Sequence, residues 1–127
     1  MKICVEKEQY RTVFVLEEGT LSASLFAQAQ KDGGFAATGE TAHGYEVVFQ
    51  APCPPAGSPQ REDATPAGTL AYYAPNHNIC MFFMDEPGND QLYILGQAEE
   101  GAENIPRLTG TIHVTAEPAM APSVQVV

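Results

Sequence analysis

Basic side chains are scarce in this sequence. Six lysines and arginines stand against sixteen aspartates and glutamates over 127 residues, which gives a formal net charge of −10. Affinity for nucleic acid comes mostly from clustered lysine and arginine, and no basic run occurs in the chain. Anionic membrane surfaces attract the same kind of cluster. The charge therefore argues against both nucleic acid and membranes as partners.

Long apolar runs and cysteine pairs are also missing. No window approaches the roughly eighteen apolar residues of a membrane span, and the apolar stretch Ile3–Val5 is too short for the core of a secretory signal. Cys4, Cys53 and Cys80 are odd in number, widely spaced and without a C-x-x-C pair. This argues against a disulfide framework and a structural zinc site. We therefore expect a cytoplasmic protein.

Turn-forming residues, in contrast, are abundant. Eleven glycines and ten prolines divide the chain into short segments, which favours strands joined by loops over long helices. A chain of this length forms one domain by default, and we place that domain at residues 1–117. Residues 118–127 are predicted to be a C-terminal tail that is either flexible or paired at a sheet edge.

Short apolar and β-branched runs predict six to eight strands. The predicted strands cover residues 3–5, 12–16, 45–49, 69–73, 79–84, 92–96 and 111–115, with 35–41 as either strand or loop. The run 79–84 is almost wholly apolar, so both of its faces should be covered. Many short strands in so few residues predict a mainly β protein, a small closed β-barrel in preference to a sandwich.

Two other segments break the strand pattern. Leu21–Lys31 has apolar residues at helical spacing and ends before Gly33-Gly34, so it predicts one helix. Residues 52–66 are rich in proline and are expected to form a mobile loop or a binding flap.

Several motifs, in a shared order, resemble those of one known family. Gly68–Pro75 followed by Asn78–Phe83 resembles the family's Gly-Asp-Ile-Ala-Tyr-Trp-Pro-Pro stretch and the apolar strand after it. Gly44–Phe49 is similar to its Gly-x-Glu-Ile-Tyr-Phe strand, and Leu95-Gly96 with Gly110–Val114 to its closing strands. This is the cyclophilin-like family of small uncharacterised prokaryotic proteins. The resemblance implies a cyclophilin-like β-barrel with one or two short helices and a function that is largely unassigned.

An apolar pocket is the candidate binding site. Aromatic side chains pack against ligands and amides orient them, and both kinds gather in one part of this chain. The ligand-binding candidates are Tyr45, Arg61, Tyr73, Asn76, His77 and Phe82. The expected occupant is a small molecule or an extended peptide. Asparagine and histidine are also ordinary turn residues, and one of two adjacent strand tyrosines must face the core. The sequence leaves that structural interpretation open.

Two enzyme classes are alternatives. A weak peptidyl-prolyl isomerase needs a donor near the prolyl nitrogen, and Arg61 is the sole candidate, although the arginine motif of true cyclophilins has no counterpart here. A cupin-like metal-dependent enzyme would use His43, His77 and His113 as ligands. Cys80 invites a nucleophile hypothesis, but its apolar surroundings favour a packing role. We assign no catalytic residue, metal ligand or cofactor.

An interaction role is the third alternative. It would use the acidic surface or a sheet edge, and the sequence leaves a homodimer open as one form of it.

Overall fold

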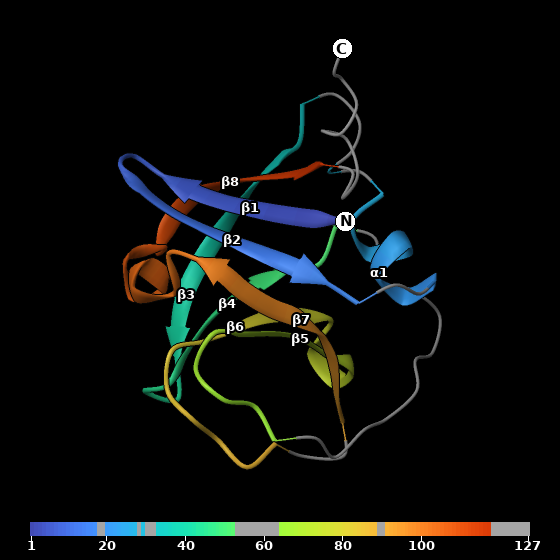
Figure 1. Ribbon diagram of the computed structural model, residues 1–127, viewed down its shortest axis with the longest axis vertical. Coiled ribbons are helices and arrows are strands. Elements are labelled where there is room, and N and C mark those ends of the chain that lie inside the picture. The colour runs from blue at the N-terminus through green and yellow to red at the C-terminus, as the bar shows by residue number, and fades with distance from the viewer. Residues whose placement is uncertain (18–19, 28, 30–32, 53–63, 89–90, 118–127) are drawn as a thin grey trace.

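The computed structural model describes residues 1–17, 20–27, 29, 33–52, 64–88 and 91–117. Eight strands dominate this part of the chain (Figure 1). They are β1 (Lys2–Lys7), β2 (Tyr10–Leu16), β3 (Phe35–Ala42), β4 (Glu46–Gln50), β5 (Thr69–Tyr73), β6 (Asn78–Phe82), β7 (Leu92–Glu100) and β8 (Gly110–Glu117). Three short helices accompany them: α1 (Thr20–Leu25), η2 (Ala74–Asn76) and η3 (Ala102–Arg107), the last two of 3-10 type.

The strands form a closed antiparallel barrel in the order β1-β2-β7-β5-β6-β4-β3-β8. Closure comes from pairing between β1 and β8, which runs from Lys2 opposite Glu117 to Glu6 opposite His113. Every described strand therefore has a neighbour on each side, which leaves few unpaired backbone groups at strand edges. The closed β-barrel that the sequence predicts is confirmed.

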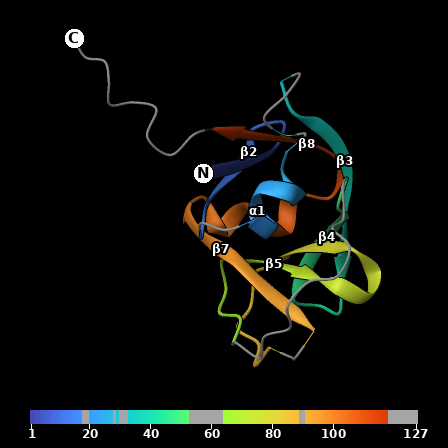
Figure 2. The ribbon, with the colours of Figure 1, turned by 90° about the vertical axis from the view of Figure 1, so that its right-hand side faces the viewer.

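Two helices cover the ends of the barrel. In Figure 1, α1 lies at one end and η3 at the other, and Figure 2, seen from the α1 end, shows α1 in front of the barrel opening. Leu25 and Phe26 at the end of α1 are fully buried in the core, as are Ile105 and Leu108 in and after η3. These apolar side chains close the barrel interior to water at both ends.

The barrel wall has apolar residues on both faces along β6. Ile79 and Met81 belong to the interior core, whereas Cys80 and Phe82 belong to a separate apolar cluster. Successive side chains of a strand point to opposite faces, so the second cluster lies on the outer face of the wall. The prediction that both faces of this run are covered is confirmed for β6. It fails at Met84 beyond the strand, which is 52% exposed.

Element boundaries differ most from the sequence prediction at the helix and at β7. The predicted helix over Leu21–Lys31 is helical from Thr20 to Leu25, and much of its second half lies outside the described residues. The polar segment after Gly96 continues β7 instead of leaving it, because Ala98 pairs with Phe14 in β2. Pairing with a neighbouring strand overrides the weak strand preference of these residues.

The remaining predictions concern the Pro-rich stretch, the C-terminal tail, residues 35–41 and membrane-spanning helices. Most of the Pro-rich stretch and the tail 118–127 lie outside the described residues. Residues 35–41, predicted as strand or loop, form β3. Among the described residues, no helix combines the length and apolar character that a membrane crossing requires.

Candidate functional site

The candidate site lies on the outer face of the wall, over β4, β6, β5 and β7. These four strands are consecutive neighbours in the barrel, although β7 meets β6 only through β5. Val48 lies opposite Cys80, and Cys80 lies opposite Ala71. Ala71 in turn lies opposite Ile94. Opposed side chains share a face, so these residues form an apolar row across the wall, with Phe82, Leu92, Tyr45 and Tyr73 packed beside it.

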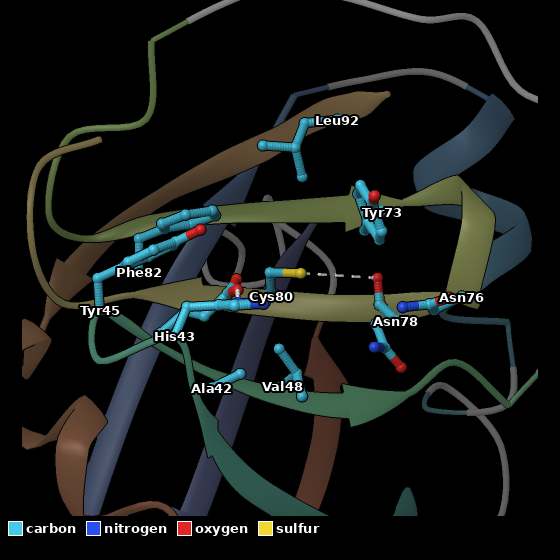
Figure 3. Close-up of a pocket in the computed structure, with 11 residues that line it drawn as sticks. Ala42, His43, Tyr45, Val48, Tyr73, Asn76, Asn78, Cys80, Phe82 and Leu92 are labelled. Atoms are coloured by element: carbon cyan, nitrogen blue, oxygen red, sulfur yellow. Dashed lines mark hydrogen bonds and ion pairs between the residues drawn. The ribbon is translucent and has the colours of Figure 1, made fainter. Parts of the chain in front are cut away.

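A cavity of about 270 Å³ opens over this row. Its lining residues come from β4, β5 and β6, from the last residue of β3 and the first of β7, and from the turn before β4 and η2. They are Ala42, His43, Tyr45, Glu46, Val48, Tyr73, Asn76, Asn78, Cys80, Phe82 and Leu92. Figure 3 shows His43, Tyr45 and Phe82 at one end, Tyr73, Asn76 and Asn78 at the other, and Cys80 between them. The pocket therefore has an aromatic end and an amide end.

The aromatic end is a stack of three rings. Tyr45 stacks on Phe82 with ring centroids 5.7 Å apart and an interplanar angle of 12°. His43 stacks on Tyr45 at 5.5 Å and 22°. His43 adopts the left-handed backbone conformation, with φ +57°, which histidine tolerates better than most residues. The turn before β4 thus directs both rings toward the pocket.

Glu46 is a buried carboxylate in the pocket lining. Its side chain is 7% exposed. The Nδ1 atom of His43 lies 2.7 Å from Glu46 Oε2, and the nearby Cys80 thiol donates to the backbone oxygen of Asn78. A buried carboxylate needs a partner such as the His43 ring, because burial without one is costly. Glu46 therefore places a buried carboxylate beside the apolar row, next to Phe82 and His43 at the aromatic end.

Ionisable groups beside Glu46 respond to burial and to this charge. Burial raises the pKa of the Cys80 thiol well above its ordinary value of 9.0, and the charge and hydrogen bond of Glu46 raise it further. Burial also raises the pKa of Tyr45, and the charges of Glu46 and Glu86 add to that rise. A cysteine nucleophile needs surroundings that stabilise the thiolate. Cys80 has the opposite surroundings, in agreement with the packing role that the sequence favours.

The amide end is formed by the turn between β5 and β6. Asn76 ends η2 and Asn78 begins β6, with His77 between them at φ +56°. The side chain of Gln50 donates to the backbone oxygens of both Asn76 and His77. This tie to the neighbouring strand holds the turn in place. The amides of Asn76 and Asn78 therefore reach the pocket from an anchored backbone.

A second depression, of about 580 Å³, adjoins the pocket on the β3 side. The ladder between β3 and β4 runs only from Glu40 opposite Val48 to Ala42 opposite Glu46. Before Glu40 the two strands diverge, and the depression lies between Phe35–Thr38 and Phe49–Pro52. Val48 and Asn78 line both hollows. The outer surface is thus hollowed continuously on both sides of β4.

The structure brings together four of the six residues predicted from the sequence. Tyr45, Tyr73, Asn76 and Phe82 line the pocket. His77 does not: it forms the turn beside the pocket, where its carbonyl accepts hydrogen bonds from Ala51 and Gln50.

Arg61 is the sequence candidate for the donor that a prolyl isomerase needs, and it falls in the Pro-rich stretch. Arg61 lies outside the described residues. The two described arginines are elsewhere: Arg11 pairs with Glu6 and Glu100, and Arg107 lies over the ring of Tyr10. No described arginine therefore borders the pocket.

The sequence pattern does not single out Glu46, the charged member of the site. Glu46 was within a predicted strand but was not a candidate, because a lone glutamate in an apolar strand normally faces solvent. The available signal was the alternation of Glu46 and Val48 with Val47 and Phe49. It places Glu46 on the same face as Val48, and on the wall shared with the apolar run of β6.

The three-histidine metal hypothesis is wrong. His43 lines the pocket, His77 lies in the turn before β6, and His113 is on β8, where its Nε2 atom lies 3.0 Å from the Gly33 oxygen. In the part of the chain that the structure describes, no three histidine, cysteine or acidic side chains are grouped as metal ligands. The cupin-like site fails because His113 lies opposite Ala36 near the start of β3, whereas His43 follows Ala42 at the other end of that strand.

The fold and the site define a small closed antiparallel barrel with a ligand-sized pocket on its outer wall. The profile of the Cyclophilin-like family matches residues 14–117. The chain belongs to this family, as the motifs in its sequence predict.

Similarity to solved structures concerns the fold alone. The chain is similar to a hypothetical protein of Archaeoglobus fulgidus with a known solution structure, at 16% sequence identity and a TM-score of 0.71. The match covers 92% of this chain and 95% of that one. No curated protein matches the chain.

Proposed function

We propose that this protein is a binding protein whose outer-wall pocket takes a small organic molecule or one side chain of an extended peptide. The observation that carries the proposal is the second apolar cluster, which lies outside a complete barrel core and surrounds a cavity of about 270 Å³. A cavity lined by apolar and aromatic side chains with a few polar groups is the usual form of a small-molecule site.

The size and lining of the pocket define the kind of occupant. Ligand pockets span about 300–1,000 Å³ and combine apolar walls with a few polar groups that orient the ligand. This pocket is at the lower limit of that range. Its walls are the rings of Tyr45 and Phe82 with Leu92, and its polar groups are Glu46 and two asparagine amides. Such a pocket suits a compact ligand better than a large cofactor.

Catalysis is not part of the proposal. The Cys80 thiol is held protonated by burial and by Glu46, and a protonated thiol is a poor nucleophile. Prolyl isomerisation would need a donor such as arginine near the prolyl nitrogen, and no described arginine borders the pocket.

A fragment screen followed by NMR tests the proposal. Fragments that bind should shift the amide signals of Val48, Ala71 and Cys80, which form the apolar row of the wall. The matched control is Val48→Phe, in which a ring should fill the cavity and abolish those shifts. If fragments shift mainly β1 and β8, or if Val48→Phe binds as well as the wild type, the proposal is wrong.

A further inference from the structure

The pocket lining contains a buried carboxylate. Glu46 is 7% exposed at its side chain, and the ring of His43 lies within hydrogen-bond distance of it. Among the described residues, no lysine or arginine lines the pocket. This carboxylate therefore differs from Glu99 and Glu100 at the end of β7, which form ion pairs with Lys2 of β1 and Arg11 of β2.

The pKa values of neighbouring groups agree with this sign of charge. The charges of Glu46 and Glu86 raise the pKa of Tyr45, and the charge of Glu46 raises the pKa of Cys80. Among the described residues, no positive group lowers either pKa. The whole chain carries a formal net charge of −10, and a field of this sign concentrates cations at a cleft and repels anions.

We propose that the ligand of this pocket carries a primary ammonium group on a short alkyl chain, an inference that rests on the binding function proposed above. The ammonium would donate to the Glu46 carboxylate, and the alkyl chain would lie along Val48 and Leu92. The amide oxygens of Asn76 and Asn78 are further acceptors at the other end of the pocket.

The ring geometry favours an ammonium with N–H donors over a quaternary ammonium. A quaternary ammonium binds on open aromatic faces. Both faces of the Tyr45 ring are covered, one by His43 and the other by Phe82 (Figure 3). The carboxylate and amide oxygens therefore distinguish the two kinds of ammonium, because they accept hydrogen bonds from N–H groups, which a quaternary ammonium lacks.

Two kinds of ligand carry a primary ammonium group on a short alkyl chain: a free alkylamine, and an extended peptide with a lysine side chain. The depression on the β3 side adjoins the pocket through Val48 and Asn78, so a peptide backbone has a surface to follow. The two sources share the ammonium and its alkyl chain, and one experiment with two sets of probes separates them.

The first set of probes is pentylamine, 1-pentanol and pentanoate, titrated by NMR at about pH 8, above the ordinary titration range of histidine. We expect pentylamine to bind at least about tenfold more tightly than 1-pentanol, because a charge-assisted hydrogen bond is roughly twice as strong as a neutral one. Pentanoate should bind most weakly. The second set is a capped tripeptide with a central lysine and the same tripeptide with norleucine.

Two variants locate the preference. Glu46→Gln keeps the shape of the side chain and an acceptor for His43 but removes the charge, so pentylamine and 1-pentanol should bind it equally. Glu103→Gln removes the same charge from the exposed surface of η3, and it should keep the tenfold preference. The wild type provides a check that needs no variant: high salt should weaken binding of the amine but not of the alcohol.

The outcomes separate this inference from the proposed function. Equal binding of pentylamine and 1-pentanol to the wild type, with shifts in the pocket, overturns the ammonium and leaves the binding function intact. Tighter binding of pentanoate also overturns it. A preference that survives in Glu46→Gln places the recognition elsewhere and overturns it too. If no probe shifts the pocket signals, and fragments do not either, both proposals are wrong.

Discussion

The two faces of the wall formed by β4, β6 and β5 differ in how completely they are filled. On the inner face, Val47, Ile79 and Met81 are fully buried in the barrel core. On the outer face, Cys80 and Phe82 are almost as buried, yet a cavity of about 270 Å³ remains beside them. Burial alone therefore does not distinguish the faces. The distinction is the cavity, which opens on the outer face beside Cys80 and Phe82.

The largest expected effect is loss of an inner-face aromatic ring. Phe49 is 2% exposed and packs near Phe35 in the interior. Phe49→Ala should lower the free energy of unfolding by about 3–5 kcal/mol, because the ring is lost and a cavity remains. Urea denaturation measures the change. Thr38→Ala, at an exposed position of β3, should stay within about 0.5 kcal/mol. A loss below about 1 kcal/mol for Phe49→Ala would contradict a closely packed interior.

Adjacent valines on β4 provide a matched test of the two faces. Val47→Phe adds a ring to the filled interior and should cost about 1–3 kcal/mol through overpacking. Val48→Phe adds the same ring to the outer cavity and should change the free energy of unfolding by less than about 1 kcal/mol. Thermal denaturation of both variants decides the comparison. Equal losses would mean that the outer face is as tightly packed as the inner one.

The smallest expected effect is a dependence of stability on alkaline pH. The thiol of Cys80 keeps its proton in the folded state, because its pKa is raised above 9.0. In the unfolded state the thiol ionises near its ordinary pKa, so the unfolded chain binds fewer protons and stability falls as pH rises. The contribution of Cys80 should be about 1 kcal/mol between pH 9 and pH 10.

Comparison with Cys80→Ala isolates that contribution. Other groups titrate in the same range, but they do so in both proteins. The difference in unfolding free energy between the wild type and Cys80→Ala should therefore shrink as pH rises from 9 to 10. A difference that stays constant with pH would show that the thiol ionises equally in both states.

The sequence predicts the barrel well because its signals are local. Short β-branched runs separated by glycine and proline lead to the strands observed, and the wholly apolar run at β6 correctly indicates two covered faces. Predicted strand boundaries are wrong where pairing with a segment distant in the sequence determines the end of a strand. Ala98 belongs to β7 because Phe14 lies opposite it, and no property of the residues around Ala98 reveals that partner.

The candidate site is predicted in part, for a related reason. Tyr45, Tyr73 and Phe82 are conspicuous as aromatic residues near strand ends, and they do line one pocket. Glu46 was missed because its role depends on Cys80 and His43 lying beside it, which the pairing of β4 with β6 and the turn before β4 produce. The three histidines failed as a metal site because residue type says nothing about which strands are neighbours.

Closure of the barrel through β1 and β8 has a consequence for how the chain folds. Lys2–Glu6 pairs with residues 113–117, so the seam joins segments more than one hundred residues apart. Pairing between such distant segments costs a large loop-closure entropy before any contact forms. Proteins in which such long-range pairs dominate fold in milliseconds to seconds. The outer pocket lies on β4, β6, β5 and β7 of the sheet that this seam closes. It should therefore become able to bind only late in folding, once the first strand has paired with the last.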